Sequence, residues 1–110
     1  MQIPFQKHPN GKGFRAFFPT KSGELNLSVV AGQDFYSTPR SDEGDSEVYT
    51  EVELAVFSGK NWASVNQLQK VFEIIGEKGE HEYTSNPDEP SNGVFGWVPI
   101  EKILEVWEKC

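Results

Sequence analysis

The sequence predicts an α+β fold in which an antiparallel or mixed sheet of about four strands carries two helices packed on one face. Three observations support this prediction. Residues 48–57 alternate between two faces, residues 65–75 form an amphipathic stretch with capping residues at both ends, and the expected elements run strand, strand, loop, strand, helix, loop, strand, helix. A length of 110 residues is typical of one domain, so we expect residues 1–110 to form a single α+β domain.

Residues 48–57 show the clearest period-two pattern, and we expect them to form the central or near-central strand. The expected inner face consists of Val48, Thr50, Val52, Leu54 and Val56, and the opposite face consists of Tyr49, Glu51, Glu53, Ala55 and Phe57. Residues 14–18 and 25–30 also alternate and are separated by a Pro-Thr-Lys-Ser-Gly break, which predicts a hairpin before this strand. Two prolines and an Asn-Gly turn in residues 1–13 indicate a partly mobile arm.

Two helices are expected in the second half of the chain. Ser64 is a suitable N-cap for the first helix, Gln67 completes a capping box, and a glycine follows the last apolar position. Residues 77–92 are rich in Gly, Pro and acidic residues and predict a long loop, which is followed by a short strand at residues 94–98. Pro99 suits the first turn of the second helix, whose apolar positions are Ile100, Ile103, Leu104 and Trp107.

Charge is distributed unequally along the chain. Residues 1–40 carry five Lys or Arg against two acidic residues, a formal charge of +3, whereas residues 41–110 carry five against fifteen, a formal charge of −10. The net charge of −7 can serve solubility alone. Alternatively, its field attracts a partner protein with a basic surface.

Acidic residues around the central strand form the candidate binding site. An acidic loop at residues 41–47 runs into the strand, and Glu51 and Glu53 project from one strand face about 7 Å apart. All three Trp are most simply core or core-edge residues, and Trp62, which lies between a turn and the helix cap, is the one best placed to bind a partner instead. The predicted partner-binding residues are Asp42, Glu43, Asp45, Glu47, Glu51, Glu53 and Trp62. The alternative is that this loop and strand face are merely solvated.

The sequence does not present residues in a pattern typical of catalysis or metal binding. His8 and His81 lie in the arm and in the long loop, and Cys110 is the last residue of the sequence. The acidic loop lacks the residue order of a calcium hand, and no His-x-x-x-His or Cys-x-x-Cys spacing occurs, so neither a metal nor a cofactor is expected. We therefore expect a protein that is not an enzyme. A single cysteine and the lack of a long apolar run favour a cytoplasmic location without membrane contact.

Residues 9–13 form a glycine-rich basic turn, which could present backbone N–H groups to a small anion. Together with Phe14, Arg15 and Phe17, this turn could stack on single-stranded nucleic acid. It lacks the Walker spacing and does not open a predicted helix. A net charge of −7 also opposes phosphate binding, so direct nucleic-acid binding is the weaker alternative.

Three stretches of the chain resemble small accessory proteins carried by phages, prophages and other mobile elements. These stretches are residues 32–40, residues 49–57 and Gly96-Trp97-Val98-Pro99. The resemblance implies an anti-defence or host-takeover role, in a set whose small acidic members include anti-CRISPR-like inhibitors that bind effector proteins. It transfers no functional residue to this chain. The Gly-Trp-Val-Pro sequence is also similar to the end of SH3-type barrels, although a helix at residues 65–75 would interrupt such a barrel.

These observations lead us to expect a small acidic non-enzymatic protein-binding module, an inhibitor or accessory factor, that engages a basic surface of a partner protein such as a nucleic-acid-binding effector. A self-associating structural or accessory protein is the first alternative, in which the basic N-terminal hairpin of one copy meets the acidic segment of another in a homodimer. A binder of single-stranded nucleic acid or a small anion is the second alternative.

Overall fold

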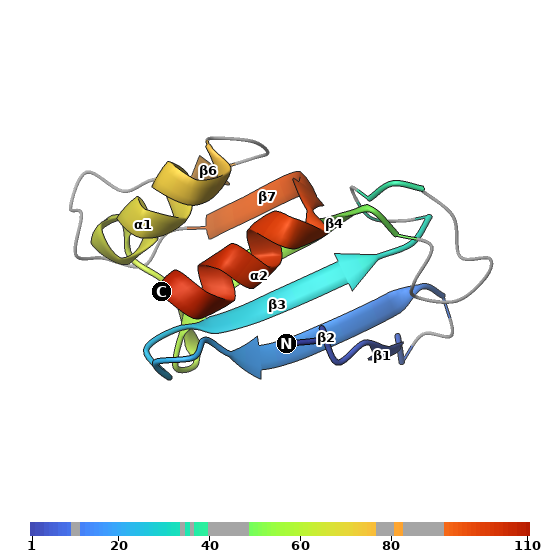
Figure 1. Cartoon of the computed structure of the whole chain (residues 1–110), viewed down its shortest axis with the longest axis horizontal. Coiled ribbons are helices and arrows are strands. Elements are labelled where there is room, and N and C mark those ends of the chain that lie inside the picture. The colour runs from blue at the N-terminus through green and yellow to red at the C-terminus, as the bar shows by residue number, and fades with distance from the viewer. Residues whose placement is uncertain (10–11, 34, 36, 40–48, 77–80, 83–91) are drawn as a thin grey trace.

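Figure 1 shows the computed structural model of the chain, which describes residues 1–9, 12–33, 35, 37–39, 49–76, 81–82 and 92–110. Its elements in chain order are β1 (Gln6–Lys7), β2 (Phe14–Pro19), β3 (Asn26–Ala31), β4 (Glu51–Ser58), β5 (Asn61–Trp62), α1 (Val65–Ile75), β6 (His81–Glu82), β7 (Asn92–Pro99) and α2 (Ile100–Lys109). The predicted α+β class with two helices is confirmed. The number of strands is larger than the four expected.

The strands form an antiparallel sheet with the order β1-β2-β3-β4-β7-β6, and β5 pairs with β4 off this path. β4 lies between β3 and β7 and is therefore an inner strand, as its alternation predicts. β2 and β3 form the predicted hairpin, with Phe14 opposite Ala31 and Pro19 opposite Asn26. The additional strands β1, β5 and β6 contain two residues each, which is too short for a periodic pattern. Each of these short segments is a strand only because it pairs with a longer neighbouring strand.

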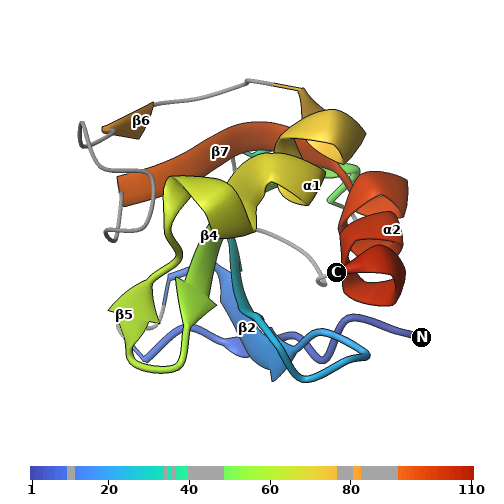
Figure 2. The same ribbon diagram turned by 90° about the vertical axis from the view of Figure 1, so that its left-hand side faces the viewer.

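Both helices pack on the same face of the sheet, as predicted (Figures 1 and 2). The strand side chains on this face are almost completely removed from solvent. Those that are 1% exposed or less include Leu27, Val29, Ala31, Val52, Leu54, Val56, Phe95 and Val98. The helices contribute the buried Leu68, Val71, Ile103 and Val106. The fold therefore has two layers and one core, and the opposite face of the sheet carries neither α1 nor α2.

α1 begins and ends where its capping residues predict. The backbone N–H of Gln67 donates to the hydroxyl of Ser64 over 3.2 Å, and the backbone N–H of Ser64 donates to the side-chain oxygen of Gln67 over 2.9 Å. This reciprocal pair satisfies two backbone donors of the first turn and forms the capping box. At the other end Gly76 adopts a φ of 80°, and its N–H donates to the carbonyl of Phe72 over 2.7 Å.

α2 follows β7 without a connecting loop and is bonded to the sheet layer at both ends. The N–H of Ile100 donates to the carbonyl of Thr50 over 3.1 Å. Near the C-terminal end, the N–H of Lys21 donates to the carbonyl of Trp107 over 2.9 Å, and the hydroxyl of Ser22 donates to the carbonyl of the last residue over 2.8 Å. Of the two helices that the structure describes, neither combines the length and the apolar character needed to cross a membrane.

β4 begins later than the predicted strand, and the expected faces are wrong for two residues before it. Tyr49, predicted to point outward, is 4% exposed, whereas Thr50, predicted in the core, is exposed. The chain bends before Glu51, and the N–H of Thr50 donates to the carbonyl of Thr38 over 2.8 Å outside any strand. The period-two pattern therefore holds only from Glu51 onward.

Trp97 is exposed to 44%, although it was expected in the core or at its edge. β4 and β7 pair through Val52 with Val98 and through Leu54 with Phe95, so one extra residue of β7 lies between these two pairs. This irregularity is a β-bulge, and Trp97 has a φ of 52° within it. The bulge turns the indole away from the core.

Two predicted irregular segments contain short strands. The arm at residues 1–13 includes β1, which pairs with β2, and the loop at residues 77–92 includes β6, which pairs with β7. The predicted acidic loop at residues 41–47 lies outside the described residues.

Candidate functional site

The sheet face opposite the helices is the candidate binding surface, which we call the open face. It consists of the outward-pointing residues of four strands, which are Arg15, Phe17, Pro19, Asn26, Ser28, Val30, Glu51, Glu53, Ala55, Phe57 and Val94. These residues are exposed or half-buried, whereas most of the residues between them in the same strands are buried. The open face therefore has the alternation of a sheet that is covered on one side only.

Strand register places seven of the open-face residues in two adjacent rows across the sheet, beside a third row of Pro19, Asn26 and Phe57. Phe17, Ser28, Ala55 and Val94 are aligned on β2, β3, β4 and β7. In the neighbouring row Arg15, Val30 and Glu53 are aligned on β2, β3 and β4. The row of Phe17 is thus mostly apolar. The next row has a basic residue, Arg15, at its β2 end and an acidic residue, Glu53, at its β4 end.

Three aromatic rings form a contiguous cluster on the open face. Phe17 is 61% exposed, and its ring centroid lies 6.1 Å from that of Phe57. Phe57 stacks on Trp62 of β5, with 4.6 Å between centroids and 28° between ring planes. The predicted binding residue Trp62 therefore supports one end of the cluster, and Phe17 is its most exposed member.

The two predicted glutamates of β4 both lie on the open face, which is the sheet face opposite α1 and α2 (Figure 2). The carboxylate of Glu51 accepts a hydrogen bond from the hydroxyl of Thr38 over 2.8 Å, and the backbones of these residues form an antiparallel bridge. This contact fixes the orientation of Glu51. Glu53 is half-buried one step further along the strand. The four remaining predicted acids lie outside the described residues, namely Asp42, Glu43, Asp45 and Glu47.

The outer edge of β2 is too short to accept an added strand. The N–H of Thr20 donates to the carbonyl of Leu25 over 2.8 Å, and bonding positions alternate along an antiparallel pair. Arg15, Phe17 and Pro19 therefore direct their backbone groups to the outer edge. β1 pairs with Arg15, and Pro19 has no N–H. Of the residues that the structure describes in β2, Phe17 alone presents both backbone groups there, so binding by strand addition is disfavoured.

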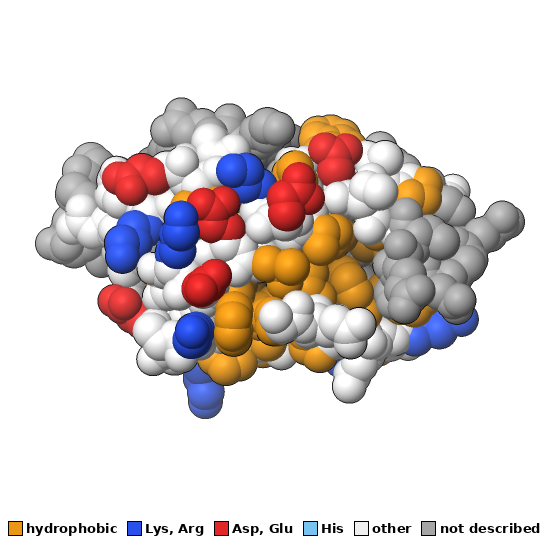
Figure 3. All heavy atoms as spheres, viewed as in Figure 1, with side chains coloured by type: hydrophobic (Ala, Val, Ile, Leu, Met, Phe, Trp, Pro, Cys, Tyr) orange, Lys and Arg blue, Asp and Glu red, His pale blue; other side chains and the backbone are white. Residues whose placement is uncertain are grey.

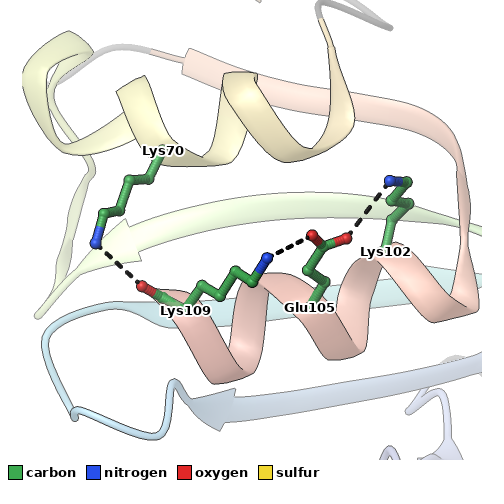
Figure 4. Close-up of polar contacts among 4 residues, drawn as sticks. All are labelled: Lys70, Lys102, Glu105 and Lys109. Atoms are coloured by element: carbon green, nitrogen blue, oxygen red, sulfur yellow. Dashed lines mark hydrogen bonds and ion pairs between the residues drawn. The ribbon is translucent and has the colours of Figure 1, made fainter.

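A groove of about 420 Å³ lies on the helix side of the molecule, between α1 and α2. Figure 4 shows Glu105 between Lys102 and Lys109, with nitrogen-to-oxygen distances of 3.4 Å and 2.9 Å, and Lys70 reaching the carbonyl of Lys109 over 3.4 Å. The hydrogen bond from Lys109 lowers the pKa of Glu105, and the same bond raises the pKa of Lys109. These ion pairs are exposed to solvent and contribute little to folding stability. The groove is therefore an ordinary charged surface between two helices.

A hollow of about 490 Å³ lies between the N-terminal segment and α2. Its walls include Ile3, Phe5, Tyr49, Ile100 and Leu104. Figure 3 shows a hydrophobic area below the charged side chains of the helices. A site for one oriented small molecule needs several convergent polar groups, and among the described residues of this wall only Gln2 and Tyr49 have polar side-chain groups. The hollow is therefore a weaker candidate than the open face.

The residues considered for catalysis are not gathered in one place. The ring of His8 lies 5.6 Å from that of Phe35 beside the edge strand β1, and the backbone of His81 is in β6 at the opposite edge. Cys110 is 8% exposed, and burial raises the pKa of its thiol. Within the described residues, no group of three or more His, Cys, Asp or Glu is placed to hold a metal ion.

Sequence reasoning did not assign Phe17 and Phe57 to the protein-binding surface. Phe17 was considered only for stacking on nucleic acid. Both residues occupy outward positions of alternating strands, and this pattern was the available signal. The alternating pattern alone does not show that these two residues are on the uncovered face, because that depends on both helices packing on the opposite face of the sheet.

Comparisons of the chain with protein-family models, with curated proteins and with solved structures gave no match. Any assignment of function therefore depends on the residues and their geometry.

Proposed function

We propose that the protein is a non-enzymatic protein-binding module and that it binds its partner with the open face. The observation that carries this proposal is the exposure of Phe17 beside Phe57 and Trp62 on a sheet face that neither helix covers. A lone exposed aromatic residue is ordinary on a protein surface. A contiguous aromatic cluster is typical of protein interfaces, because aromatic side chains are enriched there.

The exposed part of Phe17 can contribute substantial binding energy. A phenylalanine side chain buries about 150–250 Å², so covering its exposed three fifths removes about 120 Å² from water. At about 25 cal/mol per Å², this burial contributes about 3 kcal/mol. Such a value is within the range of a hot-spot residue. The Phe57 and Trp62 stack supports the ring from one side, which reduces the entropy lost on binding.

Charge on the open face favours a partner with basic residues beside an apolar area. Glu53 lies one row from Phe17 and Ala55 on the open face, and Glu51, which accepts a hydrogen bond from Thr38, lies one row further along β4. A net charge of −7 would also accelerate encounter with a basic protein, in a manner that salt weakens. An acidic surface seated on a basic site excludes other ligands of that site, so we propose the role of an inhibitor or accessory factor.

The environment of the thiol also favours binding over catalysis. A nucleophilic cysteine acts as a thiolate and is usually exposed to its substrate. Cys110 is buried, and its raised pKa keeps the thiol protonated at neutral pH.

Photo-crosslinking tests this proposal directly. A photoreactive phenylalanine analogue at position 17 should give a discrete adduct with another polypeptide in cells that express the protein. The same analogue at the exposed Gln69 of α1 serves as the matched control and should give none. Substitution Glu53→Lys should reduce the adduct at position 17 if the partner is basic there. Equal adducts from positions 17 and 69, or no adduct at position 17, would contradict the proposal.

A further inference from the structure

We infer that the open face binds a second copy of this chain, with the two sheets packed face to face about a twofold axis that runs along β3. This inference depends on the proposed binding role of the open face and names the partner, because a second copy presents a basic residue, Arg15, beside the exposed Phe17. It is carried by the register of β2, β3 and β4, which makes the open face complementary to itself.

Opposite charges would meet across such an axis. β2 and β4 flank β3, so a rotation about β3 places β2 of each copy over β4 of the other. Arg15 and Glu53 are both aligned with Val30 and therefore lie at the same level along the strands. Each Arg15 thus lies over Glu53 of the other copy, and the dimer contains two symmetric ion pairs. Aligned sheets pack about 10 Å apart at an angle of about 30°, which preserves this register close to the axis.

Large and small side chains would also meet across this axis. Phe17 and Ala55 are both aligned with Ser28, so the exposed ring of each copy lies over Ala55 of the other. Ser28 and Ala55 are small, and they leave room for a ring between the two sheets. A bulky residue opposite small ones is the arrangement that lets facing sheets interdigitate.

A twofold axis across the strands does not give this complementarity. An axis through the row of Phe17 would place the two Phe17 rings over each other. The same rotation would place Arg15 over Pro19 and Glu53 over Phe57, so no charge would meet its opposite. The charges and the side-chain sizes therefore select the axis along β3.

The size of the open face sets the strength expected for this dimer. Four strands spaced by about 4.8 Å and six residues long at about 3.3 Å give a flat area of about 380 Å². A stable interface buries about 800 Å² of accessible surface per partner. We therefore expect a dimer that forms with rising concentration between low micromolar and millimolar protein.

Sedimentation velocity with charge-reversed variants tests the inference. Wild-type protein should shift from monomer to dimer over this concentration range, whereas R15E alone and E53R alone should remain monomeric. An equal mixture of R15E and E53R should dimerise again, because both ion pairs of the mixed dimer then join opposite charges. Phe17→Ala, which changes no charge, should weaken the wild-type dimer by about tenfold or more.

The controls are charge reversals on the helix layer, Lys70→Glu and Glu101→Arg, which should associate like the wild type. Circular dichroism establishes that each variant is folded, and Phe17→Ala provides the test if either reversal at the open face is not. A wild type that stays monomeric, a dimer that no open-face variant weakens, or a mixture of folded R15E and E53R that stays monomeric would overturn the inference. If a crosslink from position 17 to a different protein accompanies a monomeric wild type, the proposed binding role still holds. If neither a crosslink nor a dimer is found, both fail.

Discussion

Phe17 and Phe18 are adjacent residues of the same type on β2, and the structure predicts opposite consequences of truncating them. Phe17 points to the open face and is 61% exposed, whereas Phe18 points to the core and is 6% exposed. Phe17→Ala and Phe18→Ala therefore remove the same atoms from one strand and differ only in what surrounded those atoms. Comparing the two variants therefore distinguishes a side chain that serves binding from a side chain that serves folding.

The expected loss of folding stability follows from these exposures. Almost all of the surface of Phe18 is buried, and replacing a core phenylalanine with alanine costs about 3–5 kcal/mol through lost burial and the cavity left behind. About 80 Å² of Phe17 is covered, which is worth about 2 kcal/mol at about 25 cal/mol per Å². Alanine retains part of that contact and leaves no cavity, so Phe17→Ala should cost about 1 kcal/mol.

Urea denaturation followed by tryptophan fluorescence measures both variants under the same conditions. The protein must be at a concentration where it is monomeric, because dissociation of a dimer would otherwise be counted as unfolding. The Phe18 variant should lose at least twice as much free energy of unfolding as the Phe17 variant. If Phe17→Ala destabilises the monomer as much as Phe18→Ala does, Phe17 is part of the core and the open face is not a binding surface.

Three further predictions concern a tight turn, a helix cap and an ion pair. Gly13→Ala should cost about 3 kcal/mol or more, because Gly13 has a φ of 73° and an added Cβ would overlap a backbone carbonyl of β3. Gly23→Ala, at a φ of 79° in open space, should cost only about 1 kcal/mol, and equal losses in chemical denaturation would contradict this. Ser64→Ala should lower the melting temperature by removing the capping box, with a cost of about 1 kcal/mol, and an unchanged melting temperature would contradict the cap. The pKa of Glu105 is lowered, so the stability contributed by its carboxylate is present at neutral pH and is lost as pH falls through the lowered pKa. An NMR titration should find a higher pKa for Glu105 in the Lys109→Met variant, and an unchanged value would show that Lys109 is not the cause.

The longer elements were predictable because a repeated pattern identifies them. β3 and the six-residue β2 alternate over their whole length, and α1 has capping residues at both ends. β1, β5 and β6 carry no such pattern, since two residues cannot display a period. Their existence depends on tertiary pairing, which local sequence does not encode.

The candidate site was only partly predictable for a related reason. Alternation correctly placed Glu51 and Glu53 together on the face opposite the apolar side chains of β4. The alignment of Arg15 with Glu53 depends on how β2, β3 and β4 pair, and a shift of one residue would have removed it. Trp97 was predicted in the core or at its edge because the extra residue in β7 becomes visible only when β7 is paired with β4.

The position of β4 between β3 and β7 has a consequence for the growing polypeptide on the ribosome. β3 is synthesised shortly before β4, but β7 begins at Asn92, after α1 has been made. During that interval one edge of the central strand is paired only at Phe57 and Ser58, by β5, and its apolar face lacks α2. Unpaired edges and exposed apolar strands are templates for aggregation. We therefore expect the nascent chain to be most prone to aggregation from the synthesis of β4 until β7 and α2, which ends at Lys109, have both been made and can pack.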